Sequence, residues 1–137
     1  MKYALWIVQI LLALAFLASG FMKLVMPVEQ LAQNMVWVND VQVWLVRFIG
    51  LAELAGGLGL VLPALTRIQP QLTPLAAAGL ALDMFLATAF HIIRGEFGVV
   101  VPTLVLLALA AFVAYGRWKL VPITPRGASA RANVAAD

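Results

Sequence analysis

The sequence predicts an all-α protein, an integral membrane four-helix transmembrane bundle. Three observations predict it: the composition, four long apolar blocks and the polar breaks between them. Of its 137 residues, 64% are hydrophobic and 11% are charged, and the mean hydropathy is +1.02. A soluble domain has roughly 45–50% apolar and about 25% charged residues. Because one spanning helix needs about 20 mostly apolar residues, a chain of this length accommodates four spans with short connections.

The apolar blocks define the expected spans within a transmembrane domain of residues 1–120. The blocks are residues 3–22, 43–62, 74–93 and 99–115. We expect Pro63 to end the second span, because proline lacks the N–H that continues a helix. Thr73 before Pro74 is typical of an N-cap followed by proline at the first helical position. Residues 121–137 are expected to form a flexible cytoplasmic tail.

Two segments allow more than one interpretation. Residues 3–22 follow a charged start and end in small residues, which is also a signal-peptide pattern, but the apolar run is long for one and we expect a span. Residues 24–42 are more polar. They form either an ordered loop or a short amphipathic helix on the membrane surface, anchored by Trp37 and Trp44.

The basic residues predict the orientation. Four spans place both termini on one side, with six Lys and Arg on that side and three on the other. The six are Lys2, Arg67, Arg117, Lys119, Arg126 and Arg131, and the three are Lys23, Arg47 and Arg94. Because cytoplasmic loops carry the excess of Lys and Arg, we expect a multi-pass protein of the inner (plasma) membrane with both termini cytoplasmic.

Five ionisable residues form a candidate polar pocket: Lys23, Arg47, Glu53, Asp83 and His91. A charge near the bilayer centre costs about 3 kcal/mol on insertion scales, so it normally faces the bundle interior or a partner. The helical rise places Glu53 about 15 Å and Asp83 about 13–14 Å from the cytoplasmic ends of their spans, so their depths nearly match. His91 follows Asp83 on roughly the same face, and we expect the pocket to open toward the non-cytoplasmic side.

The pocket has a functional and a structural interpretation. In the first, Lys23 and Arg47 contact an anionic or quinone-like head group, Glu53 or Asp83 carries protons, and His91 relays them. In the second, Glu53 pairs with one of the two basic residues to fix the helix packing. Asp83 is then protonated and hydrogen-bonded to another side chain, Thr88 or Gln9, or to a backbone carbonyl.

Several kinds of site are not expected. The chain has one histidine and no cysteine, whereas zinc sites usually take three or four protein ligands, so we expect neither a metal nor a haem site. The absence of cysteine also excludes disulfides and thiolate chemistry. The net charge of +3 reflects orientation rather than nucleic-acid binding. No catalytic residue is identified.

Glycines interrupt the second and third spans at positions where we expect close helix packing. They are Gly50, Gly56, Gly57, Gly59 and Gly79. Small residues let neighbouring helices approach in lipid, where burial of apolar side chains supplies little driving force. We therefore interpret the run Gly56-Gly57-Leu58-Gly59 as a packing feature rather than a phosphate-binding motif.

The order of short motifs along the chain resembles a known family. The motifs are Gly20-Phe21-Met22-Lys23, Arg47-Phe48-Ile49-Gly50-Leu51-Ala52-Glu53, Leu62-Pro63-Ala64, Thr73-Pro74-Leu75-Ala76-Ala77-Ala78-Gly79-Leu80 followed by His91, and Tyr115-Gly116-Arg117. Over about residues 5–117 the chain resembles the DoxX family, particularly its DoxX-like branch of small bacterial four-helix membrane proteins. Lys23, Gly50 and Glu53 sit on the family pattern.

The resemblance implies an integral membrane protein from a family in which many members have no assigned function. The family name comes from a subunit of a thiosulfate:quinone oxidoreductase, and another relative is linked to a membrane complex with superoxide dismutase and a sulfurtransferase. We therefore expect a membrane or accessory subunit of a redox-linked, quinone-associated assembly. It would not be a complete enzyme on its own, and it would have no intrinsic cofactor but a bound quinone or lipid.

Two alternatives remain open beside this expectation. One is a purely structural subunit that packs into a larger membrane complex through the small-residue faces of the second and third spans. The other is a small oligomeric transporter or proton-coupled channel. In each case the expected partners are membrane lipids and either other subunits or further copies of the chain, and not nucleic acid.

Overall fold

The computed structural model describes residues 1–125, and its regular elements are all helical. They are α1 (Lys2–Val25), α2 (Val28–Asn34), the 3-10 helix η1 (Val36–Asp40), α3 (Val43–Thr66), α4 (Leu72–Ile93), α5 (Phe97–Tyr115) and the π-helical turn η2 (Gly116–Leu120). Four stretches, α1, α3, α4 and α5 with η2, are long and apolar enough to cross a membrane. The predicted four-helix transmembrane fold is confirmed. Most of the expected tail, with Arg126 and Arg131, lies outside the described residues.

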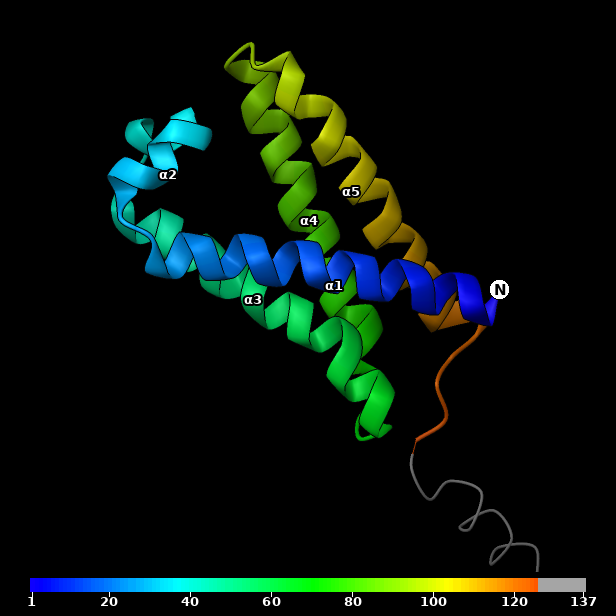
Figure 1. Cartoon of the computed structure of the whole chain (residues 1–137). Helices are drawn as coiled ribbons and strands as arrows, with labels where there is room; N and C mark the ends of the chain where they lie inside the picture. The colour runs from blue at the N-terminus through cyan, green and yellow to red at the C-terminus, as the bar shows by residue number, and fades with distance from the viewer. Residues whose placement is uncertain (126–137) are drawn as a thin grey trace, which may run out of the picture.

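The spans form two antiparallel pairs, α1 with α3 and α4 with α5, which meet mainly where α3 contacts α4. Figure 1 shows the pairs diverging on the side of α2, while the N-terminus and the end of α5 lie together at the opposite end. There Gly116 is so close to α1 that an added Cβ would lie 2.4 Å from the side chain of Leu5. The bundle is therefore closed at the end of the termini and open at the other.

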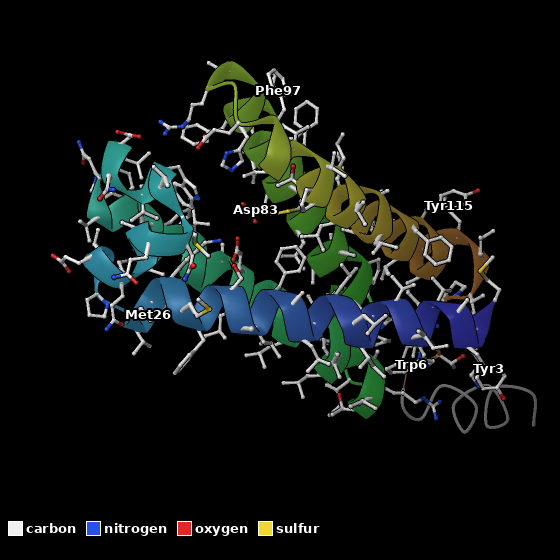
Figure 2. All side chains as sticks on the ribbon, turned by 45° about the horizontal axis from the view of Figure 1, so that its top comes forward. Tyr3, Trp6, Met26, Asp83, Phe97 and Tyr115 are labelled. Carbon is white, nitrogen blue, oxygen red and sulfur yellow. The ribbon has the colours of Figure 1, made fainter. Side chains whose placement is uncertain are left out.

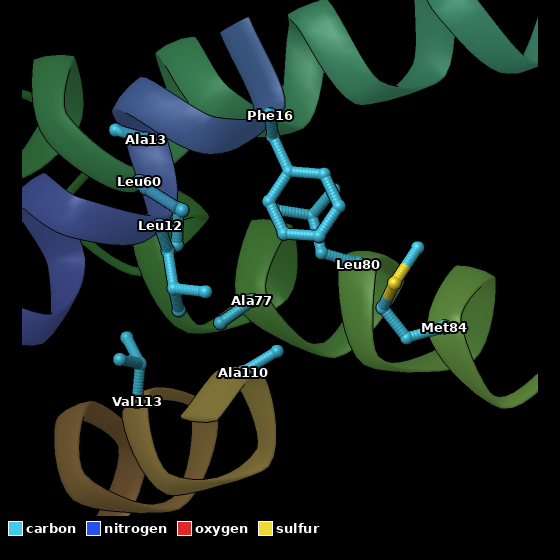
Figure 3. Close-up of a cluster of buried hydrophobic side chains, with 9 residues drawn as sticks. All are labelled: Leu12, Ala13, Phe16, Leu60, Ala77, Leu80, Met84, Ala110 and Val113. Atoms are coloured by element: carbon cyan, nitrogen blue, oxygen red, sulfur yellow. The ribbon is translucent and has the colours of Figure 1, made fainter. Parts of the chain in front are cut away.

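Hydrophobic packing fills the closed part of the bundle. Figure 3 shows this cluster, which joins all four spans: Leu12, Ala13, Phe16, Leu60, Ala77, Leu80, Met84, Ala110 and Val113. A second, smaller cluster of Leu31, Val38 and Val46 holds α2 and η1 against the start of α3. The residues of the predicted polar pocket, such as Glu53 and Asp83, lie between these two clusters.

The α1–α3 contact brings two backbones together. A Cβ on Gly20 would lie 2.6 Å from the carbonyl oxygen of Gly50, and a Cβ on Gly50 would lie 2.7 Å from the Cβ of Lys23. These distances are shorter than van der Waals contact, so only glycine fits at either position. The close approach places Lys23 directly beside α3, which positions it for the site described below.

The prediction that Pro63 ends the second span was wrong, because α3 continues through it to Thr66. A proline inside a helix removes the N–H that would bond the carbonyl four residues earlier, here that of Gly59. The hydroxyl of Thr73 donates to the Gly59 carbonyl over 3.1 Å. Helix-breaking residues are tolerated in spans when a neighbouring helix satisfies the freed backbone group in this way.

Thr73 is consequently not the N-cap of the third span, as the sequence suggests. Helix α4 begins at Leu72, with Gln71 at the N-cap position and no side-chain capping hydrogen bond. Thr73 is buried inside the first turn, where its hydroxyl serves α3 instead. Pro74 is accordingly the third residue of α4 and not the first, so both parts of the predicted N-cap motif were wrong.

The polar segment 24–42 is helical rather than an irregular loop, since it holds α2 and η1. Trp37 within this segment and Trp44 at the start of α3 differ from the expectation of paired interfacial anchors. Trp44 is exposed and its indole N–H donates to the side-chain oxygen of Gln42. Trp37 is half-buried and faces inward, toward α4. Only Trp44 is placed as an anchor.

The Thr73 hydrogen bond supports a first prediction. Thr73→Val keeps the shape of the side chain but leaves the half-buried Gly59 carbonyl without this donor, which should lower the free energy of unfolding by about 1–3 kcal/mol. The matched control is Thr66→Val, whose exposed hydroxyl bonds the Leu62 carbonyl within its own helix. Unfolding in mixed micelles measures both; equal stabilities of the two variants would contradict the assignment.

Candidate functional site

A cavity of about 610 Å³ lies between the two helix pairs and reaches under η1. Its walls are mostly hydrophobic side chains from all four spans. The polar or aromatic polar side chains that line it are Ser19, Lys23, Trp37, Glu53, Asp83, His91 and Thr103. Four of the five pocket residues predicted from the sequence thus meet around one cavity, and Arg47 does not line it.

Lys23 and Glu53 form a buried ion pair that joins α1 to α3. The Lys23 ammonium lies 2.7 and 2.9 Å from the two carboxylate oxygens of Glu53. Ser19, one helical turn before Lys23, donates to Glu53 over 2.7 Å and accepts from Lys23 over 3.0 Å. Glu53 is only 2% exposed, so these contacts satisfy both charges away from solvent. The structural interpretation of this pair holds, with Lys23 as the partner.

Arg47 has a backbone role. One of its guanidinium nitrogens donates to the carbonyls of Lys23 and Met26 over 2.7 and 2.8 Å. The last carbonyls of a helix have no partner within it, and an arginine that bonds them also complements the negative end of the helix dipole. Arg47 therefore caps α1 from α3. The expectation that it contacts a head group in the pocket does not match this placement.

Asp83 enters the cavity from α4 and has spare hydrogen-bonding capacity. Figure 2 shows its side chain directed toward the space between the helix pairs. Its Oδ2 atom is buried and has no hydrogen-bond partner among the described residues. Two partners considered from the sequence are engaged elsewhere: Thr88 bonds Thr103 over 2.9 Å, and Gln9 bonds the Leu60 carbonyl over 2.8 Å.

His91 connects the cavity to the outer surface. The ring is 5% exposed, and its Nδ1 lies 3.1 Å from Glu96. Glu96, whose side chain is 25% exposed, also accepts from Arg94 over 2.6 Å, and Arg94 donates to Asp40 of η1 over 2.6 Å. Hydrogen bonds from Arg94 and then from His91 lower the pKa of Glu96 below its usual 4.5. This network ties η1 to the α4–α5 turn across the open end.

Three rings cover the outer part of the cavity. Trp37, Phe90 and His91 pack edge to face, with centroid distances of 6.1, 6.4 and 5.3 Å. The ammonium of Lys23 lies 5.9 Å from the Trp37 ring, within the range of cation–π attraction. The aromatic cluster therefore separates the buried ion pair from the aqueous side.

A model of the DoxX-like family matches residues 7–113. The chain belongs to the DoxX-like family. No curated protein and no solved structure matches it. The matched stretch includes Lys23, Glu53, Asp83 and His91, so the cavity lies within the family's common part. With its four apolar helices, this DoxX-like chain is a small multi-pass membrane protein.

The predicted packing glycines of the DoxX-like chain serve its own bundle. An added Cβ would lie 2.9 Å from Leu17 at Gly57, 2.7 Å from Leu80 at Gly56 and 2.7 Å from Ala76 at Gly59. Gly57 therefore admits α1, and the other two admit α4. An added Cβ on Gly79 would meet nothing within 4 Å. Gly79 thus lies beside open space and is not a packing glycine.

Sequence reasoning overlooked two polar groups. Ser19 is four residues before Lys23, so helical spacing would have found it. Arg117 is 4% exposed, donates to Gln9 and lies 5.3 Å from the Trp6 ring. The sequence places Arg117 at the interface, since it ends the last span; only the π-helical turn carries it inward. Its Nη2 has no partner among the described residues.

The ion pair generates a second prediction. Glu53→Gln or Lys23→Met alone should lower the free energy of unfolding by about 3–5 kcal/mol, because each leaves one buried charge unpaired. The double variant should lose less than either single variant, since it leaves no charge. A double-mutant cycle in mixed micelles measures this coupling.

An exposed ion pair provides the control. Asp40 is 53% exposed in its side chain, so Asp40→Asn should cost less than about 1 kcal/mol. Additive losses in the Lys23 and Glu53 cycle would show that the two charges do not depend on each other.

The Glu96 network generates a third prediction, on pH. The lowered pKa of Glu96 adds stability that is fully present above its unfolded value of 4.5 and is lost as the pH falls through the folded value. We expect the unfolding midpoint of the protein to fall on acidification across this range. In Glu96→Gln the fall should be smaller. Parallel pH profiles of the two proteins would refute the contribution of this group.

Proposed function

We propose that this protein is an accessory membrane subunit of a redox-linked assembly and that it binds a quinone in the cavity between its helix pairs. The observation that carries the proposal is an apolar cavity in which Lys23 pairs with Glu53 while one carboxyl oxygen of Asp83 has no hydrogen-bond partner within residues 1–125. In this proposal the termini are cytoplasmic in the inner membrane, and the end with His91 faces the opposite side.

The size and lining of the cavity support a small amphiphile. Ligand pockets are typically about 300–1,000 Å³, mainly apolar, with a few placed polar groups. The volume of about 610 Å³ and the hydrophobic walls around Asp83 and His91 agree with this pattern. A quinone ring with its first tail carbons is a ligand of this kind.

The paired charges favour a neutral head group. Lys23 is neutralised by Glu53, and Arg47 bonds the end of α1 instead of lining the cavity. Neither cation is free for an anion, so an anionic head group would enter without a counter-charge and would lose its hydration. The anionic ligand considered from the sequence is therefore not part of the proposal.

Asp83 and His91 supply the hydrogen-bonding chemistry that a quinone head needs. A carboxylate oxygen of Asp83 would accept from a hydroquinone hydroxyl, and a protonated Asp83 would donate to a quinone carbonyl. His91 lines the same cavity and contacts Glu96, which reaches the surface. These groups offer a route for protons between the ligand and water.

The redox centre is assigned to a partner subunit. The chain has no cysteine and one histidine, and among residues 1–125 no three His, Cys, Asp or Glu side chains converge as metal ligands. The role proposed for this chain is to hold the quinone and exchange its protons, while electrons pass to or from another protein.

Binding of a short-tailed benzoquinone to the full chain in nanodiscs tests the proposal, with native mass spectrometry as the readout. Asp83→Asn should weaken binding about tenfold, equal to about 1.4 kcal/mol. Glu29→Gln, which removes an exposed carboxylate of α2, should not. An analogue with the same tail but a carboxylate head should not compete.

Three outcomes would count against a quinone site. Equal binding by the Asp83→Asn variant would remove the assigned head-group contact. Competition by the carboxylate analogue would show that the paired charges do not select a neutral head. Absence of quinone binding, with only larger protein partners retained, would favour a purely structural subunit.

A further inference from the structure

A second cavity, of about 450 Å³, runs along the outer seam between α3 and α4. Small residues line most of its length, among them Ala55 and Gly59 from α3 and Ala76 from α4. On α4 it extends from Leu72 to Asp83, which at the helical rise of about 1.5 Å per residue is about 16 Å. We call this cavity the seam groove.

The seam groove is adjacent to the cavity between the helix pairs, which we call the inner cavity. Ala52, Gly79 and Asp83 line both of them. Ala52 and Gly79 are the small residues at this junction, and Asp83 is the polar one, with its Oδ2 atom unpartnered among the described residues. These three residues therefore place the seam groove beside the polar part of the inner cavity, between α3 and α4.

We propose that the seam groove holds the hydrocarbon tail of the amphiphile whose head group occupies the inner cavity, and that Ala52, Gly79 and Asp83 form the passage between head and tail. This inference rests on the proposed quinone site and deepens it. It identifies the ligand class as a long-tailed neutral amphiphile that enters from the membrane through the side of the bundle.

The composition of the groove fits a hydrocarbon chain. Within residues 1–125 Asp83 is the one charged residue in its lining, and it lies at the end nearest the inner cavity. In lipid an apolar chain gains little by leaving other chains, so binding depends on packing and on the anchored polar end. A groove with a carboxyl at one end and small apolar residues along the rest provides both.

A helix of a second copy fits the groove less well. Beneath it α3 and α4 already touch, since an added Cβ on Gly59 would lie 2.7 Å from the Cβ of Ala76. Packed helices are separated by 8–10 Å between axes, so a partner helix would cover the groove from outside. It would not reach the shared residues Ala52 and Gly79 from both cavities, whereas a single hydrocarbon chain is narrow enough to lie along them.

Gly79 permits a test that spares the fold. An added Cβ at this position meets nothing within 4 Å, so Gly79→Ala is accommodated, and Gly79→Leu adds the bulk intended to fill the junction. Replacing glycine inside a helix also improves helix propensity. Gly98→Leu is the matched control, because that glycine is equally open and lines neither cavity. Gly79→Ala, which adds one methyl group, is the milder variant.

The experiment uses the full chain in nanodiscs and a benzoquinone whose long alkyl tail carries a diazirine near its end. After irradiation, peptide mapping should find the label on residues 52–63 and 72–83, and excess unlabelled quinone should remove it. Gly79→Leu should abolish this labelling and weaken quinone binding about tenfold, or about 1.4 kcal/mol. Gly98→Leu should change neither, and Gly79→Ala should have the smaller effect.

A phosphatidylcholine with the same diazirine tail identifies ordinary bilayer lipid. Equal labelling of the groove by that lipid, without competition from unlabelled quinone, would overturn the inference. So would quinone binding that Gly79→Leu leaves unchanged or a tail label outside α3 and α4; the head-group site would then stand alone. If no quinone binds to the unsubstituted protein, the proposed function and this inference fall together.

Discussion

The buried ion pair between Lys23 and Glu53 is the constraint on which the bundle depends. Each charge alone would be costly inside a membrane, and together they are satisfied by each other and by Ser19. The pair requires α1 and α3 to lie close, and Gly20 and Gly50 let their backbones touch beside it. The packing of α1 against α3 thus depends on this ion pair and on the glycines at positions 20 and 50.

This constraint also determines the character of the cavity. Lys23 and Glu53 neutralise each other, and Arg47 is engaged with the end of α1. Within the described part of the chain, the space between the helix pairs therefore contains a few polar groups but neither Lys23 nor Arg47 as a free cation. The hydrophobic core occupies the end near the termini, and the diverging end is bridged by Arg94 and Asp40. A packed half and a hollow half therefore coexist in one small bundle.

In our proposal the two cavities bind different parts of one ligand, its head group and its hydrocarbon tail. The inner cavity gathers the few hydrogen-bonding groups, and the seam groove offers small apolar residues on the lipid side. Asp83 lines both cavities. In the proposal it marks the boundary between the polar and apolar parts of the amphiphile, which would reach the protein from the surrounding lipid rather than from water.

Sequence alone determined the four spans and identified four of the ionisable residues that line the cavity, Lys23, Glu53, Asp83 and His91. A helix must be long and apolar to span a bilayer. Because the rise per residue is constant, the position of a residue in the chain gives its depth in the membrane. Rise does not determine rotation about a helix axis, so only the tertiary structure decided that Lys23 pairs with Glu53 and that Arg47 caps α1. Likewise Pro63 stays within α3 because a hydroxyl from α4 satisfies the freed carbonyl, and Gly79 borders open space because of how two helices splay. Such outcomes depend on partners distant in the chain.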